Sequence, residues 1–307
     1  MKISTGLVFE RATQQISTVQ SELARSQAQV SSGKDIIHPS DAPDKASSIQ
    51  RLRSMLDRQL SYGDTIKTVQ TRLQAEDTSL GSVTEILTRI KEIAVQSAND
   101  TLSGPNRQAL GVELKGLRDQ LLSLANSQDT TGNFIFAGSR LTQPPFPTGP
   151  DGTVQYQGDQ TRMMVSIGDQ RSLPINRSGS AVFVPVMRTG AQGQAVGVGF
   201  FQALDDLSAS VNSSNQAGMQ RGIGEMETLL QGVLLGRADV GTDLAVADQQ
   251  TSVLDDVTLN LKSTLSDVED LDFAAAVTKM NKQMLSLEAA QASFAKIAKL
   301  NLFNYIN

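Results

Sequence analysis

Apolar residues recur at alternating steps of three and four near both ends of this 307-residue chain. That spacing gathers them on one face of an α-helix and is typical of a coiled-coil seam. The first seam consists of Phe9, Ala12, Ile16, Val19, Leu23 and Val30, and Ser26 interrupts it. The last consists of Phe273, Val277, Met280, Met284, Leu287, Phe294, Ala298 and Tyr305, and Gln291 and Asn301 interrupt it. The spacing therefore predicts a helical arm at each end.

The C-terminal arm carries more apolar residues than one helix face can hold. A second stripe, made of Leu285, Ala289, Ala292, Ile297 and Leu300, runs beside the first. Pairing the two arms would bury one seam on each helix and leave this stripe in water, which favours burial against other subunits. We expect the arms to gain order on assembly. The candidate assembly residues are Phe9, Ala12, Ile16, Val19, Leu23, Val30, Phe273, Val277, Met280, Met284, Leu287, Phe294, Ile297, Leu300, Leu302, Phe303 and Tyr305.

A short link follows the first arm. Gly33 can adopt a positive φ and end the first helix. Pro39 and Pro43 mark irregular backbone, and Ser40 or Asp41 can cap the helix that follows. The sequence therefore predicts a break between the first arm and a second helical region.

Helical spacing covers most of the remaining chain. One long pattern runs from about 44 to 99, and a shorter one has leucines on one side over 110–124. The short connection between them predicts an antiparallel hairpin. Helical spacing returns near 201 and continues to the end, with an acidic segment at 266–272 that favours helix capping and a linker role over a metal site.

The period changes in the middle of the chain. Short strand-like runs separated by Gly, Pro and Asp predict a small β-rich insertion. A glycine-rich segment at 190–200 matches no phosphate-binding fingerprint and is expected to be a turn-rich connection. The predicted strands lie within 132–139, 152–159, 162–169 and 180–184.

Together these patterns predict a mainly α chain with a small β-rich insertion. We expect an elongated rod of antiparallel helices in which the N- and C-terminal coiled-coil arms pair together, since such pairing buries both seams. The predicted domains are terminal assembly arms (1–43 and 268–307), an α-helical rod domain (44–132 and 201–267) and a β-rich outer domain (133–200).

Composition argues against several classes of function. The net charge of −5 disfavours nucleic-acid binding, and the absence of Cys removes disulfides and thiolate chemistry. The chain has one His, His38, and no recognisable catalytic motif, so we expect neither an enzyme nor a cofactor or metal. It has no apolar run long enough to span a membrane and no apolar leader of the secretory type.

Four segments resemble the bacterial flagellin family. They are SSGKDIIHPSDAPDKA (31–46), EIAVQSAND (92–100), RADVGTDL (237–244) and SDVEDLDFAAAVTKM (266–280), and they cover both arms and both rod regions. Within the family, four further segments resemble the members that join the hook to the filament. These are MKISTGLVF (1–9), GNFIFAGSR (132–140), VQYQGDQTRMMVSIG (154–168) and KLNLFNYIN (299–307).

The resemblance implies a structural role at the hook–filament junction. It implies a ring of identical subunits that contacts the first hook-associated protein on the hook side and flagellin on the filament side. It further implies export through the flagellar type III apparatus without a cleaved signal peptide, an extracellular location, and a cytoplasmic chaperone that binds the C-terminal arm before export. No nucleic acid or membrane partner is implied.

Two other interpretations remain open. A filament flagellin would use the same arms in many identical axial contacts, although the ending LFNYIN and the segment FIFAGS argue against it. An enzyme carried as a flagellin insertion is the third hypothesis. The chain offers no HExxH motif, no nucleophile with a His and Asp beside it, and no room for a large extra domain.

Overall fold

The computed structural model describes residues 2–99, 102–190 and 193–303, and for residues 2–5, 8 and 297–303 it describes the backbone alone. The chain forms two compact units. Unit one comprises Met1–Gln59 and Asp256–Asn307, and unit two comprises Leu60–Asp255. This division keeps the β-rich insertion together with helices, so the three-part division of the sequence analysis stays a prediction.

Unit one is built around two antiparallel helices, α1 (Lys2–Ser32) and α7 (Phe273–Phe303). It also contains a 3-10 turn, η1 (Pro39–Asp41), the first part of α2 (Pro43–Ser97) and the last part of α6 (Gln216–Glu269). The predicted pairing of the two terminal helices is confirmed by the edge-to-face contact of Phe9 with Phe294.

The ends of these helices follow from local chemistry. α1 ends at Ser32 because Gly33 takes a φ of +69°, as predicted. The Asp272 carboxylate accepts a hydrogen bond from the Ala275 N–H at 3.1 Å and caps α7, which confirms the capping role of the acidic segment. The predicted cap of α2 is wrong. Asp41 instead accepts from the N–H groups of Ile37 and His38, which precede it, and so fixes the link rather than the helix.

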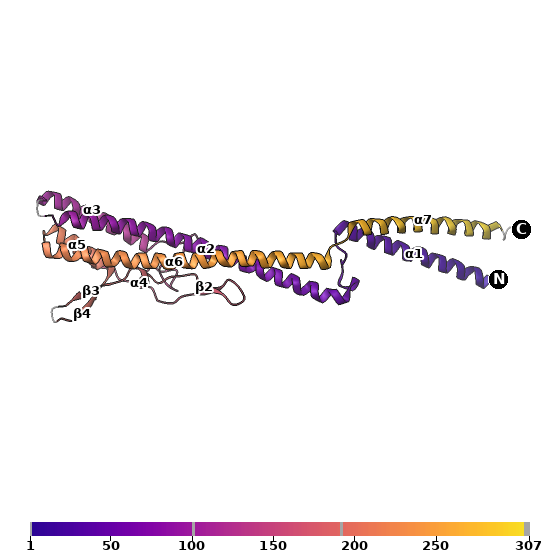
Figure 1. Cartoon of the computed structure of the whole chain (residues 1–307), viewed down its shortest axis with the longest axis horizontal. Helices are drawn as coiled ribbons and strands as arrows, with labels where there is room; N and C mark the ends of the chain where they lie inside the picture. Colours follow the sequence, from indigo (N-terminus) through magenta and orange to yellow (C-terminus); the bar gives the residue numbers. More distant parts are fainter. Residues whose placement is uncertain (1, 100–101, 191–192, 304–307) are drawn as a thin grey trace. The chain divides into compact units, whose positions relative to one another are not determined.

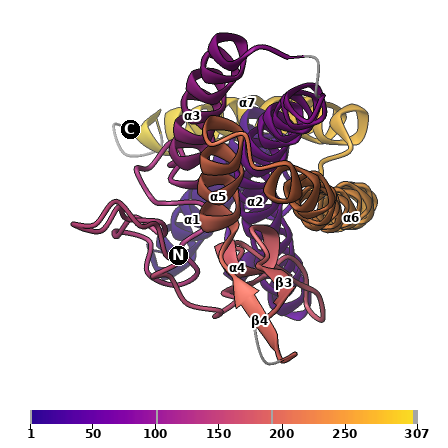
Figure 2. The same cartoon turned by 90° about the vertical axis from the view of Figure 1, so that its left-hand side faces the viewer.

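Unit two is a bundle of α2, α3 (Gly104–Ala125), α5 (Phe200–Asn212) and α6. α2 and α3 are antiparallel, because Arg89 contacts Glu113 and Ser79 contacts the Leu124 carbonyl. The pairs Lys91–Glu227 and Asp77–Arg237 likewise make α2 and α6 antiparallel. α3 and α5 lie side by side (Figures 1 and 2). The helix–break–helix pattern predicted for about 44–124 is therefore confirmed.

The described residues of the insertion form two antiparallel ribbons and one short helix. β1 (Met164–Ser166) pairs with β2 (Ser172–Pro174), and β3 (Val186–Thr189) pairs with β4 (Ala195–Val198). α4 (Gly179–Val182) lies between the ribbons in the sequence. Buried side chains of this region, including Phe136, Ile167 and Val182, belong to the same hydrophobic cluster as the helices. The insertion therefore packs onto the bundle and shares its core.

Several strand predictions in the insertion are wrong. Segments 132–139 and 152–159 form only single β-bridges, because aspartates such as Asp129 and Asp159 bind nearby backbone N–H groups and shape turns there. Segment 180–184 was predicted as a strand, but Ser178 accepts from the Ser180 N–H and caps the helical turn α4. The glycine-rich segment 190–200 contains β4, since Gly197 pairs with Met187 within the ribbon.

Candidate functional site

The predicted seam on α1 lies on the face that meets α7. Phe9, Ala12, Ile16, Val19, Leu23 and Val30 are all partly buried. Two polar residues of the same face, Ser26 and Gln29, are more deeply buried than any of them. Gln29 donates to the Asp35 carbonyl at 2.6 Å, so the polar end of the seam is tied to the link.

The facing seam on α7 differs from the predicted one. Its buried or partly buried positions follow steps of four and three: Ala276, Met280, Gln283, Leu287, Ala290 and Phe294. The rings of Phe9 and Phe294 meet with centroids 5.3 Å apart and planes at 83°. The structure thus brings Met280, Leu287 and Phe294 to α1.

Three other predicted residues of α7 lie outside the buried seam, although the Phe273 ring also touches Gly33 at the end of α1. Phe273 is 53 % exposed, Val277 38 % and Met284 43 %. They lie one helical position to the side of the seam, and we call them the apolar stripe. Leu285, in the second predicted stripe, is also exposed. The side chains of Ile297, Leu300, Leu302 and Phe303, and the whole of Tyr305, lie outside the described residues.

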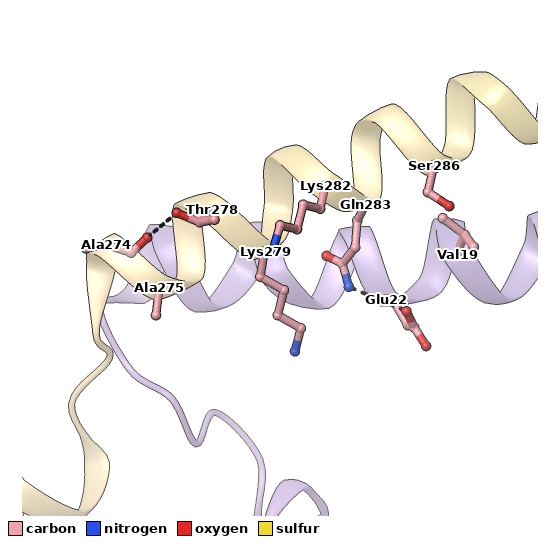
Figure 3. Close-up of a pocket in the computed structure, with 9 residues that line it drawn as sticks. All are labelled: Val19, Glu22, Ala274, Ala275, Thr278, Lys279, Lys282, Gln283 and Ser286. Carbon is pink, nitrogen blue, oxygen red and sulfur yellow. Dashed lines mark hydrogen bonds between the residues drawn. The ribbon is translucent and has the colours of Figure 1, made fainter.

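A groove runs along the opposite side of α7, between it and α1 (Figure 3). It has a volume of about 740 Å³, and we call it the arm groove. Small side chains form much of its wall, and Lys279 and Lys282 add positive charge. Gln283 donates from Nε2 to Glu22 at 3.4 Å, while its buried Oε1 has no hydrogen-bond partner among the described residues. The lining residues are Val19, Glu22, Ala274, Ala275, Thr278, Lys279, Lys282, Gln283 and Ser286.

The joint between the helices of unit one is held by a buried carboxylate. Glu269, at the end of α6, pairs with Lys34 and lies 2.5 Å from Arg53 Nη2. Backbone bonds add to this joint, since Asp35 N–H donates to the Glu269 carbonyl and Leu271 N–H donates to the Gly33 carbonyl. Sequence reasoning missed these pairs, because no local pattern links a carboxylate to a cation so distant in the chain.

The link carries a further electrostatic tie. The Asp41 carboxylate accepts from the His38 backbone N–H and lies 3.0 Å from Arg25 of α1. The His38 bond, together with the Arg25 charge and the Ile37 N–H bond, lowers the pKa of Asp41. A charged Asp41 therefore connects the link to α1 at neutral pH.

No described helix has both the length and the apolar character needed to cross a membrane. Across the described ranges, no group of three or more His, Cys, Asp or Glu side chains is arranged to hold a metal ion. The features that stand out in unit one are the apolar stripe and the arm groove.

Comparison with known proteins shows the family of the chain. The profile of the bacterial flagellin N-terminal helical region matches residues 3–140, and that of the C-terminal helical region matches residues 223–306. Flagellar hook-associated protein 3 of Escherichia coli strain K12 is 28 % identical over 99 % of both chains. The protein of the same name from Salmonella typhimurium is 27 % identical over the same shares.

A solved structure has the same fold. A flagellar hook-associated protein described as putative, from Vibrio parahaemolyticus, aligns with a TM-score of 0.66 and 21 % identity. The alignment covers 75 % of this chain and all of that one. The two profiles together span both arms and most of the helical bundle, and the matched relatives are similar along their whole length. The chain belongs to the bacterial flagellin family of structural flagellar proteins.

Proposed function

We propose that this protein is an axial structural component of the bacterial flagellum that forms the adaptor ring between hook and filament. The observation that carries the proposal is the apolar stripe, because Phe273, Val277 and Met284 remain exposed after α1 and α7 have paired. Exposed apolar side chains in a row mark a surface for protein contact. Full-length similarity to proteins named flagellar hook-associated protein 3 supports the junction as the location.

The proposal includes a set of partners. The terminal helices copolymerise with copies of this chain in the ring, with the first hook-associated protein on the hook side and with flagellin on the filament side. A cytoplasmic chaperone covers the C-terminal arm before type III export, and no signal peptide is cleaved. The mature protein is extracellular. Its role is structural and not catalytic.

The role of the arms can be tested by truncation. A chain that lacks residues 273–307 loses α7 and with it both the seam and the apolar stripe. We expect unit two to stay folded and filament attachment to be abolished. Normal filament attachment by the truncated chain would contradict the proposal.

The location is tested by immunogold electron microscopy of flagella from the source cell. A single labelled band between hook and filament is the expected result. Label along the filament would instead make the protein a filament flagellin, the second candidate function, which the flagellin profiles also favour. An absence of label on flagella would contradict both.

A further inference from the structure

A cavity in unit two lies between α2 and the turn 129–133 that leads into the insertion. It has a volume of about 510 Å³, and we call it the α2 pocket. One wall consists of side chains of α2 from Thr68 to Ala75, and the other consists of residues of the turn together with Leu141 and Ile175. All of these residues belong to unit two, so the pocket is formed within one compact unit.

The turn holds a carboxylate in a fixed position at the pocket wall. Asp129 Oδ1 accepts hydrogen bonds from the Thr131 N–H at 2.9 Å, from the Thr131 hydroxyl at 2.6 Å and from the Asn133 N–H at 3.0 Å. The Asp129 N–H donates to the Asn133 carbonyl at 2.8 Å and closes the turn, and Gly132 takes a φ of +81° within it. The Asp129 side chain is therefore positioned by its own loop.

Arg72 of α2 forms an ion pair with this carboxylate. Its Nη1 donates to Asp129 Oδ2 at 2.6 Å, and the two side chains are only 13 % and 9 % exposed. Although burial opposes the shift, the hydrogen bonds from Thr131 and Asn133 and the charge of Arg72 lower the pKa of Asp129. At neutral pH the pocket wall therefore carries one positive and one negative charge, which balance each other.

One end of the guanidinium lacks an acceptor. Arg72 Nη2 is buried and has no hydrogen-bond partner among the described residues. Buried polar groups in native proteins are nearly always hydrogen-bonded, so an orphan donor in a residue that lines a cavity indicates a place for an acceptor from outside the chain. Hydrogen bonds from a charged donor are also stronger than those between neutral groups. The first requirement for a ligand of the α2 pocket is thus an acceptor oxygen.

The exposed rim of the pocket supplies acceptors for a donor on the same ligand. The hydroxyls of Thr68 and Thr71 donate to the backbone carbonyls of Asp64 and Lys67 at 3.1 Å and 2.9 Å. Their hydrogens are thereby used, whereas each oxygen still has lone pairs that can accept. Thr68 lies four residues before Arg72 and therefore on the same face of α2. A ligand that carries an acceptor next to a donor fits this face.

The rest of the lining is apolar. It is formed by Val69, Ala75, Leu141 and Ile175, of which Val69 is buried and the others are partly buried. An apolar ligand body would be buried against these side chains, as in small-molecule sites that combine an apolar lining with a few polar groups.

The balanced charges decide the polar group of the ligand. A carboxylate would meet the negative charge of Asp129, and an ammonium group would meet the positive charge of Arg72, so an uncharged group is favoured. We propose that the α2 pocket binds a small uncharged molecule that carries a carboxamide on an apolar body. Its carbonyl oxygen accepts from Arg72, and its N–H donates to a threonine hydroxyl of the rim. This inference goes beyond the proposed function and uses no residue of the terminal arms.

Methyl NMR of the full-length chain provides the test, because Val69, Leu141 and Ile175 place methyl groups in the lining. The probes are cyclohexanecarboxamide and cyclohexanecarboxylate, which have the same apolar body and differ in charge. We expect the amide to shift the methyl signals of these three residues in a saturable way. The carboxylate should bind about tenfold more weakly, because its charge meets that of Asp129. An absence of shifts at these methyl groups, or tighter binding of the carboxylate, would overturn the inference.

Three variants test the position and the chemistry of the site. A75L fills the pocket and should abolish amide binding, whereas Q74L, which adds the same side chain at an exposed position outside the lining, should leave it unchanged. R72K keeps the charge opposite Asp129 but lacks the second nitrogen of the guanidinium. It should weaken amide binding about tenfold, because a hydrogen bond to a charged donor is lost.

The spectrum of the remaining methyl groups shows whether each variant is folded. Equal amide binding by R72K and the native chain would show that Arg72 does not recognise the amide and would overturn the inference. Amide binding by A75L that matches the native chain would place the probe elsewhere and overturn it as well. Filament attachment and the place of the label on flagella do not depend on these results, so the proposed function is tested separately.

Discussion

Phe9 of α1 and Phe294 of α7 meet edge to face, with ring centroids 5.3 Å apart, although they come from opposite ends of the chain. Both rings are partly buried in the seam between the helices. Because α1 packs along α7, this contact reports whether the terminal helices are paired.

We predict that F9A and F294A each loosen α1, and that the two effects are not additive. Edge-to-face pairs contribute about 0.5–1.5 kcal/mol beyond the burial of their area. Amide hydrogen exchange of α1 measures the loss, and the double variant gives the coupling energy. M284A removes an exposed side chain that is not part of the seam, so it should leave α1 exchange nearly unchanged. Equal effects of M284A and F294A would contradict the seam as described.

We predict that the joint of unit one tolerates the loss of its carboxylate better than the loss of its two cations. Glu269 is 3 % exposed, whereas Lys34 and Arg53 are about half exposed. K34M/R53M leaves a buried carboxylate without a charge partner, while E269Q leaves two cations that can reach water. The double variant should therefore lower the free energy of unfolding of unit one more than E269Q does, measured by urea unfolding. A larger loss in E269Q would contradict the burial of Glu269.

We predict that Arg177 is the most sensitive charged residue of unit two. Its guanidinium is 5 % exposed and binds Glu76 at 2.7 Å and Asp243 at 2.9 Å, so it ties the insertion to α2 and α6. R177M should cost about 3–5 kcal/mol in unfolding free energy, because Glu76 is left buried and unpaired. R237M, which breaks the exposed pair with Asp77, should cost at most about 1 kcal/mol. R177M/E76L should recover much of the loss.

The loss of stability caused by R177M should also depend on pH. Burial raises the pKa of Glu76 above its ordinary value of 4.5, although Arg177 opposes the shift. The folded chain then binds the Glu76 proton more tightly than the unfolded chain does, so its contribution is fully present below 4.5 and is lost as pH rises through the raised pKa. R177M should therefore be least destabilising at acidic pH. A deficit that is constant or grows as pH falls would contradict this.

We predict that the stabilising contribution of Asp159 changes with pH in the opposite direction to that of Glu76. Hydrogen bonds from the Ser139 hydroxyl, the Ser139 N–H and the Thr161 N–H lower the pKa of Asp159 from 3.8 to about 2. Its stabilising contribution is present above 3.8 and is lost as pH falls through about 2. D159N should flatten this part of the acid unfolding curve. S139A removes one donor, so NMR titration should find a higher Asp159 pKa.

The sequence predicted the helices well, because period and punctuation are local properties. The long helix expected over about 44–99 is observed as Pro43–Ser97, and Gly33 ends α1 as expected. The pairing of the terminal helices could be predicted because each helix has an apolar seam that is buried when the two helices pack together. Packing rules therefore extended local signals to the correct helix pairs.

What the sequence could not give depends on contacts between distant residues. Steps of three and four run through both Met280 and Met284, and only the position of α1 shows that Met280 is in the seam while Met284 is exposed. The pairs of Glu269 with Lys34 and Arg53 produce no repeating pattern in the sequence by which they could be predicted. In the insertion, the ribbons are three or four residues long, which is too short for alternation to stand out from turns.

The pairing of α1 with α7 has a consequence for folding kinetics. All of unit two lies between these helices in the sequence, so closing their contact costs more chain entropy than closing any hairpin inside unit two. Contacts of such high sequence separation form slowly. A chain delivered from its N-terminus onward would hold α1 without its partner until α7 also emerged, and the bundle of unit two would fold first. The pairing of α1 with α7 is then the last step of folding.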